Sequence, residues 1–286
     1  MHRRLVVVAL VVLAAAAPVR AQRQPPEDLA KTLAQVAQRV EAWYGRAQTV
    51  VATETVVIQP LGLNSTPSVI PRRLVFELRV GWEPDPDRPG GPLVASVLRQ
   101  PISSGRASRR DDPGCMDPKP VSPEPLAMLL PERLNESRFS LAGTGRVDRR
   151  AAVMIDFRGV MAAPPEVTWT GECVSVSLPG RSRGRIWVDA ATHDVLRIDD
   201  RLIGTFTLDV PREQVRRGST STMVIESAES SIRYRQVSFQ DPEEALMLPV
   251  SIDITTVIRG ATTQRMRISQ RLSDYRRFLT GGRIVD

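Results

Sequence analysis

Cysteine and histidine are scarce in this chain of 286 residues, which contains only two of each. His2 lies in an apolar N-terminal segment, so His193 is the only histidine in the remainder. A zinc site of the usual kind needs three or four nitrogen or sulfur ligands, and we therefore expect no metal site. No nucleophile motif such as G-x-S-x-G is present. We accordingly expect no catalytic residues, no cofactor and no enzyme activity.

Lysine is nearly absent, since Lys31 and Lys119 are the only two, and the formal net charge of +7 rests on arginine. Acidic residues are interspersed with these arginines along the chain. A protein that binds nucleic acid through its phosphates usually carries a continuous basic stripe. The sequence lacks such a stripe, and we expect no nucleic-acid partner.

The chain also lacks a long apolar run, because its longest, from Leu5 to Ala17, has only 13 residues. A membrane-spanning helix needs about 20 apolar residues, which argues against an N-terminal anchor. Two arginines precede the run, and a proline and small residues follow it. This order is typical of a secretory signal peptide. We predict a signal peptide at residues 1–21, cleavage after Ala21, a periplasmic or secreted protein, and no transmembrane segment after cleavage.

The two cysteines, Cys115 and Cys173, both follow the predicted cleavage site. An exported protein passes into an oxidising compartment, where an even number of cysteines favours a disulfide. Closing a loop of about 58 residues would contribute about 4 kcal/mol in the chain-entropy description. The alternative is two free thiols too far apart to meet. We predict a Cys115–Cys173 disulfide.

Apolar residues first recur with helical spacing at Leu29, Leu33, Val36, Val40 and Trp43. Steps of three and four place them on one stripe of an amphipathic helix. A helix of this kind can lie on a membrane surface, but its polar face mixes both charge signs rather than being rich in lysine and arginine. Packing against the protein's own sheet is the better interpretation.

From residue 49 onward the apolar period changes from 3.6 to 2, as in "RRLVFELRVGW" at residues 72–82. This alternation predicts strands with one dry and one wet face, and we count roughly ten candidates by this criterion. We predict a mainly β (α+β) fold: one strongly curved antiparallel sheet, or half-barrel, with the N-terminal helix packed on it. Residues 22–286 are expected to form this single domain, with a long polar loop at about 99–125 that is either functional or mobile.

Two polar residues stand out near the middle of the chain. His193 lies between two alternating segments, where a turn needs a residue at positive φ, and histidine is enriched there after glycine, asparagine and aspartate. We interpret it as a turn residue rather than a catalytic base. Asp200 shares its parity with Leu196, Ile198 and Leu202. A buried carboxylate is costly, so either a bulge re-aims it or it lies at the rim of a cavity.

The order and wording of several segments resemble a known group of proteins. They are "AWYGRAQTVVATETVVIQ", "VMIDFRGV", "GRIWVDAATHDVLRID", "MLPVSIDI" and "RISQRLSDYRRF". The chain resembles exported bacterial proteins related in fold to the lipoprotein-carrier (LolA-like) half-barrels and to the MucB/RseB-type sensors of sigma-factor regulation. In such proteins a glycine usually follows the threonine of the third segment, where this chain has His193. The resemblance implies a curved sheet whose concave apolar face, capped by helices, can hold acyl chains.

These inferences predict a non-enzymatic envelope protein that binds a hydrophobic ligand, either a lipid or a lipoprotein acyl chain, on the concave face. By strand parity the candidate lining is Leu74, Phe76, Leu78, Val153, Ile155, Phe157, Leu202, Phe206, Ile252 and Ile254. The alternative is an envelope interaction or sensor protein that has a filled core, binds no ligand, and uses its convex face or its long loop.

Overall fold

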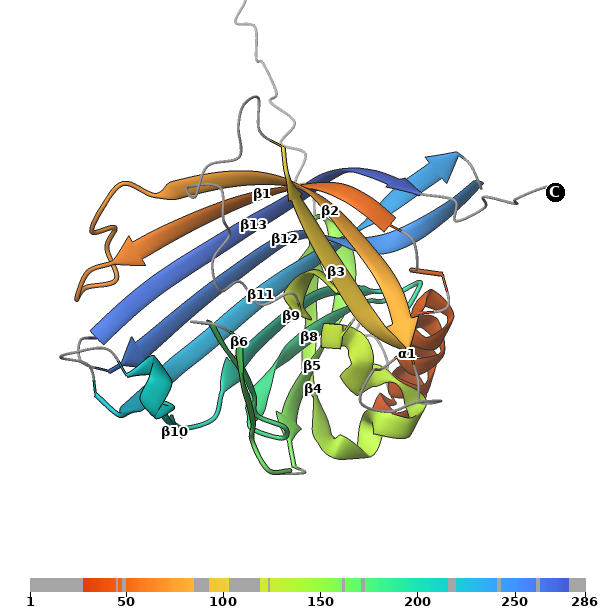
Figure 1. Ribbon diagram of the computed structural model, residues 1–286. Coiled ribbons are helices and arrows are strands. Elements are labelled where there is room, and N and C mark those ends of the chain that lie inside the picture. Colours follow the sequence, from red (N-terminus) through yellow and green to blue (C-terminus); the bar gives the residue numbers. More distant parts are fainter. Residues whose placement is uncertain are drawn as a thin grey trace, which may run out of the picture.

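A curved antiparallel sheet dominates the computed structural model (Figure 1). The structure describes residues 28–44, 46–47, 50–84, 93–102, 119–122, 124–160, 163–170, 173–215, 220–240, 243–260 and 263–277. The strands are β1 (Val50–Leu61), β2 (Arg72–Pro84), β3 (Leu93–Pro101), β4 (Ser137–Val147), β5 (Arg150–Gly159), β6 (Glu166–Thr170), β7 (Cys173–Ser177), β8 (Ser182–Asp189), β9 (Val195–Leu202), β10 (Phe206–Asp209), β11 (Thr222–Gln240), β12 (Glu243–Arg259) and β13 (Thr263–Arg277).

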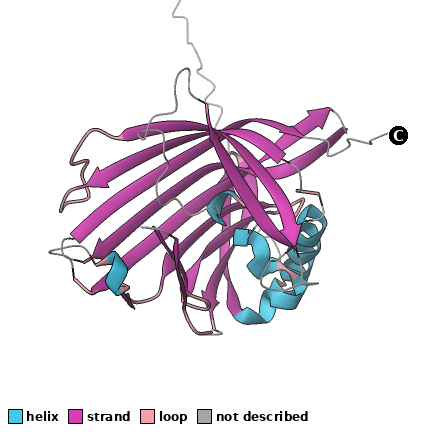
Figure 2. Cartoon of the chain, in the orientation of Figure 1, coloured by secondary structure: helices cyan, strands magenta, loops and turns pink. Residues whose placement is uncertain are grey.

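The helices are few and short apart from the first (Figure 2). They are α1 (Leu29–Tyr44) and the 3-10 helices η2 (Lys119–Val121), η3 (Glu124–Leu129), η4 (Pro131–Glu136) and η5 (Arg212–Gln214). Of the loop predicted at about 99–125, residues 99–101 continue β3, and the described residues from 119 onward enter η2 and η3. In the part of the chain that the structure describes, no helix is long and apolar enough to cross a membrane.

The main sheet contains 11 strands in the order β3-β2-β1-β13-β12-β11-β9-β8-β5-β4, with β10 also paired to β11. All of its pairings are antiparallel, and β1, the first strand, pairs with β13, the last. β6 and β7 form a separate two-stranded ribbon. Because β3 and β4 are the two edges and do not pair, the sheet stays open. The predicted half-barrel is therefore confirmed.

One row of isoleucines defines the face of the sheet that we call the inner face. Residues directly opposite each other in neighbouring strands share a face, and the register aligns Ile155, Ile186, Ile198, Ile232 and Ile252 in this way. Each of these side chains is buried. The alternation read from the sequence therefore assigns this dry face correctly.

The predicted amphipathic helix is also confirmed and packs on the inner face. Its N-terminus is capped by Asp28, whose carboxylate accepts a hydrogen bond from the Ala30 amide at 3.0 Å. Val36, Val40 and Trp43 are buried and belong to the same apolar cluster as the isoleucine row. Burying a side chain of this size contributes about 1.5–3 kcal/mol, which explains why a single helix is fixed on the sheet.

Helix α1 covers only part of the inner face. It has 16 residues and is about 24 Å long at 1.5 Å per residue. Strands β11 and β12 have 19 and 17 residues, about 56 Å or more at 3.3 Å per residue. Figure 1 shows α1 and the helices η3 and η4 gathered at one end of the sheet. We call the covered part of the inner face the closed half and the part beyond these helices the open half.

Candidate functional site

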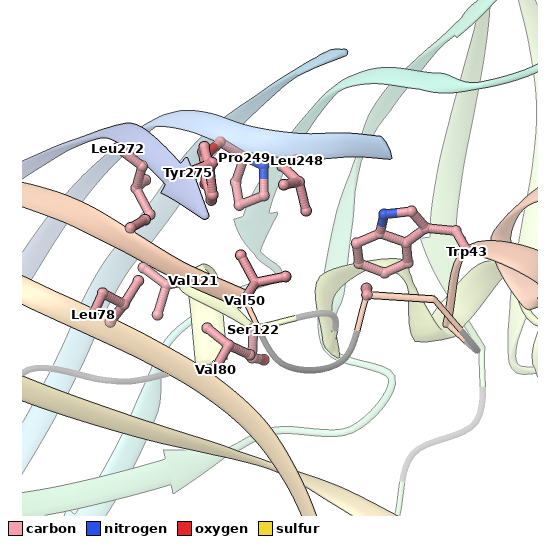
Figure 3. A pocket seen from close by; sticks show the side chains of 12 residues that line it. Trp43, Val50, Leu78, Val80, Val121, Ser122, Leu248, Pro249, Leu272 and Tyr275 are labelled. Carbon is pink, nitrogen blue, oxygen red and sulfur yellow. The ribbon is translucent and has the colours of Figure 1, made fainter. Parts of the chain in front are cut away.

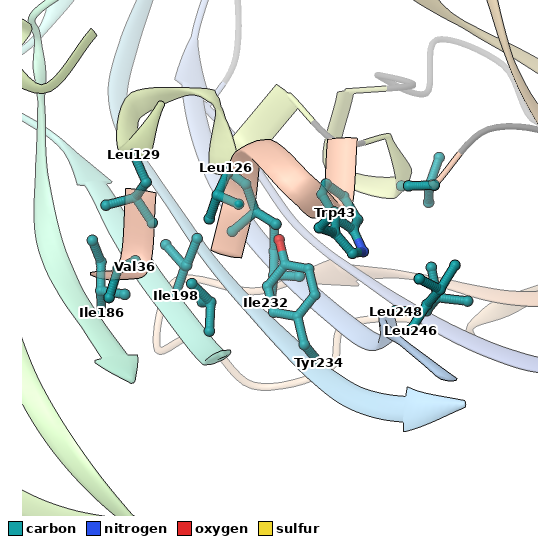
Figure 4. Close-up of a cluster of buried hydrophobic side chains, with 14 of the residues drawn as sticks. Val36, Trp43, Leu126, Leu129, Ile186, Ile198, Ile232, Tyr234, Leu246 and Leu248 are labelled. Atoms are coloured by element: carbon teal, nitrogen blue, oxygen red, sulfur yellow. The ribbon is translucent and has the colours of Figure 1, made fainter. Parts of the chain in front are cut away.

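The closed half is filled by side chains of the protein itself. Figure 4 shows Val36 and Trp43 of α1 and Leu126 and Leu129 of η3 facing the strand residues beneath them. Five of the ten predicted lining residues are buried in this cluster: Leu78, Val153, Ile155, Phe157 and Ile252. Leu74 and Phe76 are also buried, but they form a separate cluster with Val56, against which Ile58 and Ile268 pack. Leu202, Phe206 and Ile254 are only partly buried.

The closed half contains two cavities of different size. One cavity between Trp43 of α1 and Leu78, Val80 and Leu272 of the sheet has a volume of about 20 Å³ (Figure 3). A space of this size holds about one water molecule, which excludes an acyl chain. A second cavity of about 160 Å³ lies beside Trp43 and Tyr234. The Trp43 Nε1 atom and the Tyr234 hydroxyl are buried and have no hydrogen-bond partner among the described residues.

The open half carries apolar side chains that remain partly exposed. Ile58 pairs with Ile268, and Ile268 pairs with Ile254, so the three lie side by side across β1, β13 and β12. All three are partly buried. Further along the same face, Ile258 faces Ile225, which in turn faces Phe206. The inner face therefore remains largely apolar where α1 no longer covers it, with Arg72 opposite Ile58 and Gln264 opposite Ile258.

Asp200 lies at the polar end of the row formed by Ile58, Ile268 and Ile254. It faces Ser230 of β11, and Ser230 faces Ile254 of β12. The Ser230 hydroxyl donates a hydrogen bond to the Asp200 carboxylate at 2.5 Å. Burial raises the pKa of Asp200, partly offset by the hydrogen bond from Ser230, and the nearby Asp199 charge raises it further. The parity argument for Asp200 is thus correct, and a serine partner accommodates the group.

A second buried polar group was not found from the sequence. Glu54 of β1 is fully buried, and Arg99 of the edge strand β3 pairs with it. The Arg99 Nε atom lies 2.7 Å from one carboxylate oxygen, and Nη2 lies 3.3 Å from the other. Glu54 shares the parity of the buried Ala52 and Val56, and Arg99 shares that of the partly buried Val97. This parity is a signal that the sequence contains. The pair ties the edge strand to the interior.

His193 has the backbone conformation that the turn hypothesis requires, with φ of 60°. Its amide donates to the Asp189 carbonyl at 3.0 Å, and the Asp189 amide donates to the Asp194 carbonyl at 2.9 Å. The Asp189 carboxylate accepts hydrogen bonds from the Ala191 and Thr192 amides. The turn prediction is confirmed, and Asp189 organises the turn.

The outer face, opposite the isoleucine row, carries charged residues and a hollow of about 760 Å³. Some of its charges are paired: Arg185 contacts Asp156 at 2.6 Å, and Arg197 contacts Asp199 at 2.7 Å. The Arg197 guanidinium also lies 4.6 Å from the centre of the Trp187 ring, within the range of a cation–π interaction. This hollow is polar, and its lining also includes Asp200 and Ser230.

No cluster of metal-ligating side chains occurs among the residues that the structure describes. Cys115 lies outside them, as does the predicted signal segment 1–21. Cys173 begins β7. The Cys115–Cys173 disulfide and the signal peptide therefore stay predictions.

Comparison with known proteins finds similar solved structures but no similar sequences. No protein-family model matches the chain, and no curated protein matches it.

Among solved structures, a putative outer membrane lipoprotein-sorting protein domain from Vibrio parahaemolyticus is 10% identical, with a TM-score of 0.41, over 90% of this chain and 96% of that one. A LolA superfamily protein from Nitrosomonas europaea is 8% identical, with a TM-score of 0.38, over 88% and 96%. MucB from the Pseudomonas aeruginosa MucA/MucB complex is 9% identical, with a TM-score of 0.21, over 87% and 100%. These likenesses to solved structures concern the fold alone.

Proposed function

We propose that this chain is an exported, non-enzymatic envelope protein that binds an amphipathic lipid or lipoprotein acyl chain on the open half of the inner face. The observation that carries the proposal is the row of Ile58, Ile268 and Ile254, which lie side by side and remain partly exposed. A contiguous exposed apolar surface on a protein usually marks a binding site.

The position of Asp200 adds a polar end to this apolar row. An acyl chain along the isoleucines would place the adjoining polar group of the ligand near Asp200 and Ser230. Burial raises the pKa of Asp200, which favours its protonated form, and that form can both donate and accept a hydrogen bond. An ester, amide or hydroxyl group is therefore the expected polar neighbour.

The closed half supports the fold rather than the ligand. Its cavity of about 20 Å³ is too small for a chain of methylene groups, and its cavity of about 160 Å³ is lined in part by the charged residues Arg39, Arg46 and Asp194. We therefore propose that Leu78, Val153 and Ile155 are core residues and that the ligand contacts, among the predicted lining residues, Ile254, Leu202 and Phe206.

The test is binding of a fluorescent palmitic-acid analogue to Ile254→Asn and Ile268→Asn variants. Losing the burial of one isoleucine against the probe weakens binding about tenfold or more. The matched control is Val57→Asn, because Val57 is half-buried on the outer face of the same region. Mass spectrometry of the protein purified from the exported fraction records any lipid that it carries.

Equal probe affinity in wild type, both inner-face variants and the control would refute the proposal. An absence of both probe binding and copurified lipid would do the same. The sensor or interaction function, with a filled core and no ligand, would then take its place.

A further inference from the structure

The loop joining β1 and β2 carries an unusual concentration of exposed aliphatic side chains. Leu63 is 83% exposed, Val69 58% and Ile70 92%. All three lie within residues 62–71, and the stretch from Gln59 to Pro71 contains no charged residue. Single exposed aliphatic residues are ordinary on soluble proteins, whereas three in one short loop mark a contact surface.

This loop has a hydrogen-bonded backbone that holds the aliphatic side chains outward. The Gly62 amide donates to the Thr66 carbonyl at 2.8 Å, and the Ser68 amide donates to the Pro60 carbonyl at 3.1 Å. The Gln59 side chain donates to the Val69 carbonyl at 2.8 Å. A backbone ordered in this way loses little conformational entropy on binding.

The neighbouring outer face is positively charged. Arg73 faces Val57, Arg267 faces Gln59 and Arg265 faces Leu61, so the three arginines flank the base of the loop. Within the described part of the chain, no acidic side chain forms an ion pair with any of them.

Two of the nearby acidic groups are already bonded, whereas Glu229 of β11 lies in the same row as Arg267, two strands away across Thr255. Asp253 contacts Ser269 and Arg271, and Glu226 contacts Arg259. Three arginines and the Glu229 carboxylate leave an excess of positive charge at the end of the sheet near the loop, beside the exposed aliphatic groups.

We propose that the β1–β2 loop docks the protein on an anionic phospholipid bilayer. Leu63, Val69 and Ile70 enter the interface between headgroups and acyl chains, and Arg73, Arg265 and Arg267 contact the phosphate groups. Membrane-surface binding of proteins combines these two contributions, apolar insertion and attraction to anionic lipid. The loop lies at the opposite end of the sheet from α1, so helix packing does not obstruct contact (Figure 1).

The test is vesicle co-sedimentation of the protein as the cell exports and processes it. One set of vesicles contains about one part phosphatidylglycerol to three parts phosphatidylcholine, and the other contains phosphatidylcholine alone. We expect the wild type to bind the anionic vesicles more strongly, and added salt to weaken that binding because it screens the arginines.

Replacing Leu63, Val69 and Ile70 together by serine should weaken binding to anionic vesicles about tenfold or more. Replacing Arg73, Arg265 and Arg267 together by glutamine should weaken it at least about fivefold and remove the salt dependence. In the matched control, serine replaces Leu98 and Val160. These two side chains are 52% and 44% exposed and lie outside the loop. Circular dichroism verifies that each variant is folded.

Loss of vesicle binding in both loop and arginine variants but not in the control supports the proposal. Three results would overturn it: no binding by the wild type, unchanged binding by the serine variant, or an equal loss in the control. Ile254→Asn is expected to bind vesicles as the wild type does, so failure of the acyl-chain proposal and failure of the docking proposal are separable.

Discussion

The buried ion pair between Glu54 and Arg99 provides the sharpest test of the packing described above. Replacing Arg99 with leucine removes the cation but leaves Glu54 where it is fully buried. At 2.7 Å, two unit charges attract by about 6 kcal/mol at an effective dielectric constant of about 20. Much of this attraction offsets the cost of desolvating the two groups, so the pair itself stabilises the fold only modestly.

Removing one partner destabilises the fold by more than the intact pair stabilises it. An uncompensated buried charge typically destabilises a protein by about 3–5 kcal/mol. For a chain of this size, 1 kcal/mol shifts Tm by roughly 2–4 °C. We therefore expect Arg99→Leu to lower Tm by about 6–20 °C, measured by circular dichroism, and to lower the urea midpoint correspondingly.

Two further variants complete this experiment. Arg79→Leu breaks the exposed Arg79–Glu77 pair on the neighbouring strand, at 2.8 Å and with an arginine side chain 47% exposed. Exposed pairs contribute about 0–1 kcal/mol, so this control should change Tm little. The double variant Glu54→Leu with Arg99→Leu should recover most of the lost stability. Equal losses in Arg99→Leu and Arg79→Leu would refute the reasoning.

Three smaller predictions concern β8, β9 and the turn between them. His193→Gly should change the free energy of unfolding by less than about 1 kcal/mol in urea titrations, because glycine accepts positive φ, whereas His193→Val should cost about 1–2 kcal/mol. In Gly184→Ala the new Cβ would lie 1.9 Å from the Asp199 carbonyl oxygen, so we expect the free energy of unfolding to fall by about 3 kcal/mol or more. Gly81→Ala serves as the control, because the space around Gly81 is open. Burial raises the pKa of Asp200, so the folded state holds this proton to higher pH than the unfolded state does. The free energy of unfolding therefore falls as pH rises above about 4. Asp200→Asn should flatten this part of a plot of Tm against pH.

Much of the fold follows from local sequence patterns. Alternation along each strand is a steric property of extended chains, so it identified Ile155, Ile252 and Ile254 as inner-face residues without knowledge of their neighbours. The positive φ of His193 follows similarly, because only a few residue types tolerate that conformation in a tight turn. Asp200 was placed on the dry face by the same parity.

Other features depend on register and on where elements end, which local patterns do not determine. Glu54 and Arg99 are 45 positions apart in the chain, and they meet only because β3 pairs with β2 and β2 with β1 in one particular register. Ser230 likewise becomes the partner of Asp200 through the β9–β11 pairing. The proline and glycine residues around Leu63 and Ile70 do predict a surface loop, but local patterns do not determine which of its side chains turn outward.

The position of the open half is a consequence of chain connectivity. Only five residues separate Tyr44, the last residue of α1, from Val50, the first residue of β1. The helix must therefore lie over the end of the sheet where β1 begins, and its length of about 24 Å does not reach the other end.

Strand β1 has 12 residues and carries the chain about 40 Å away before the β1–β2 loop begins. The uncovered apolar surface and the exposed aliphatic loop consequently share one end of the sheet. An acyl chain leaving a bilayer at the docked loop would then meet the row of Ile58, Ile268 and Ile254 directly. Lengthening the connector between α1 and β1 would remove this constraint on where the helix lies. We expect probe binding to weaken if the helix then shifts over Ile58, Ile268 and Ile254.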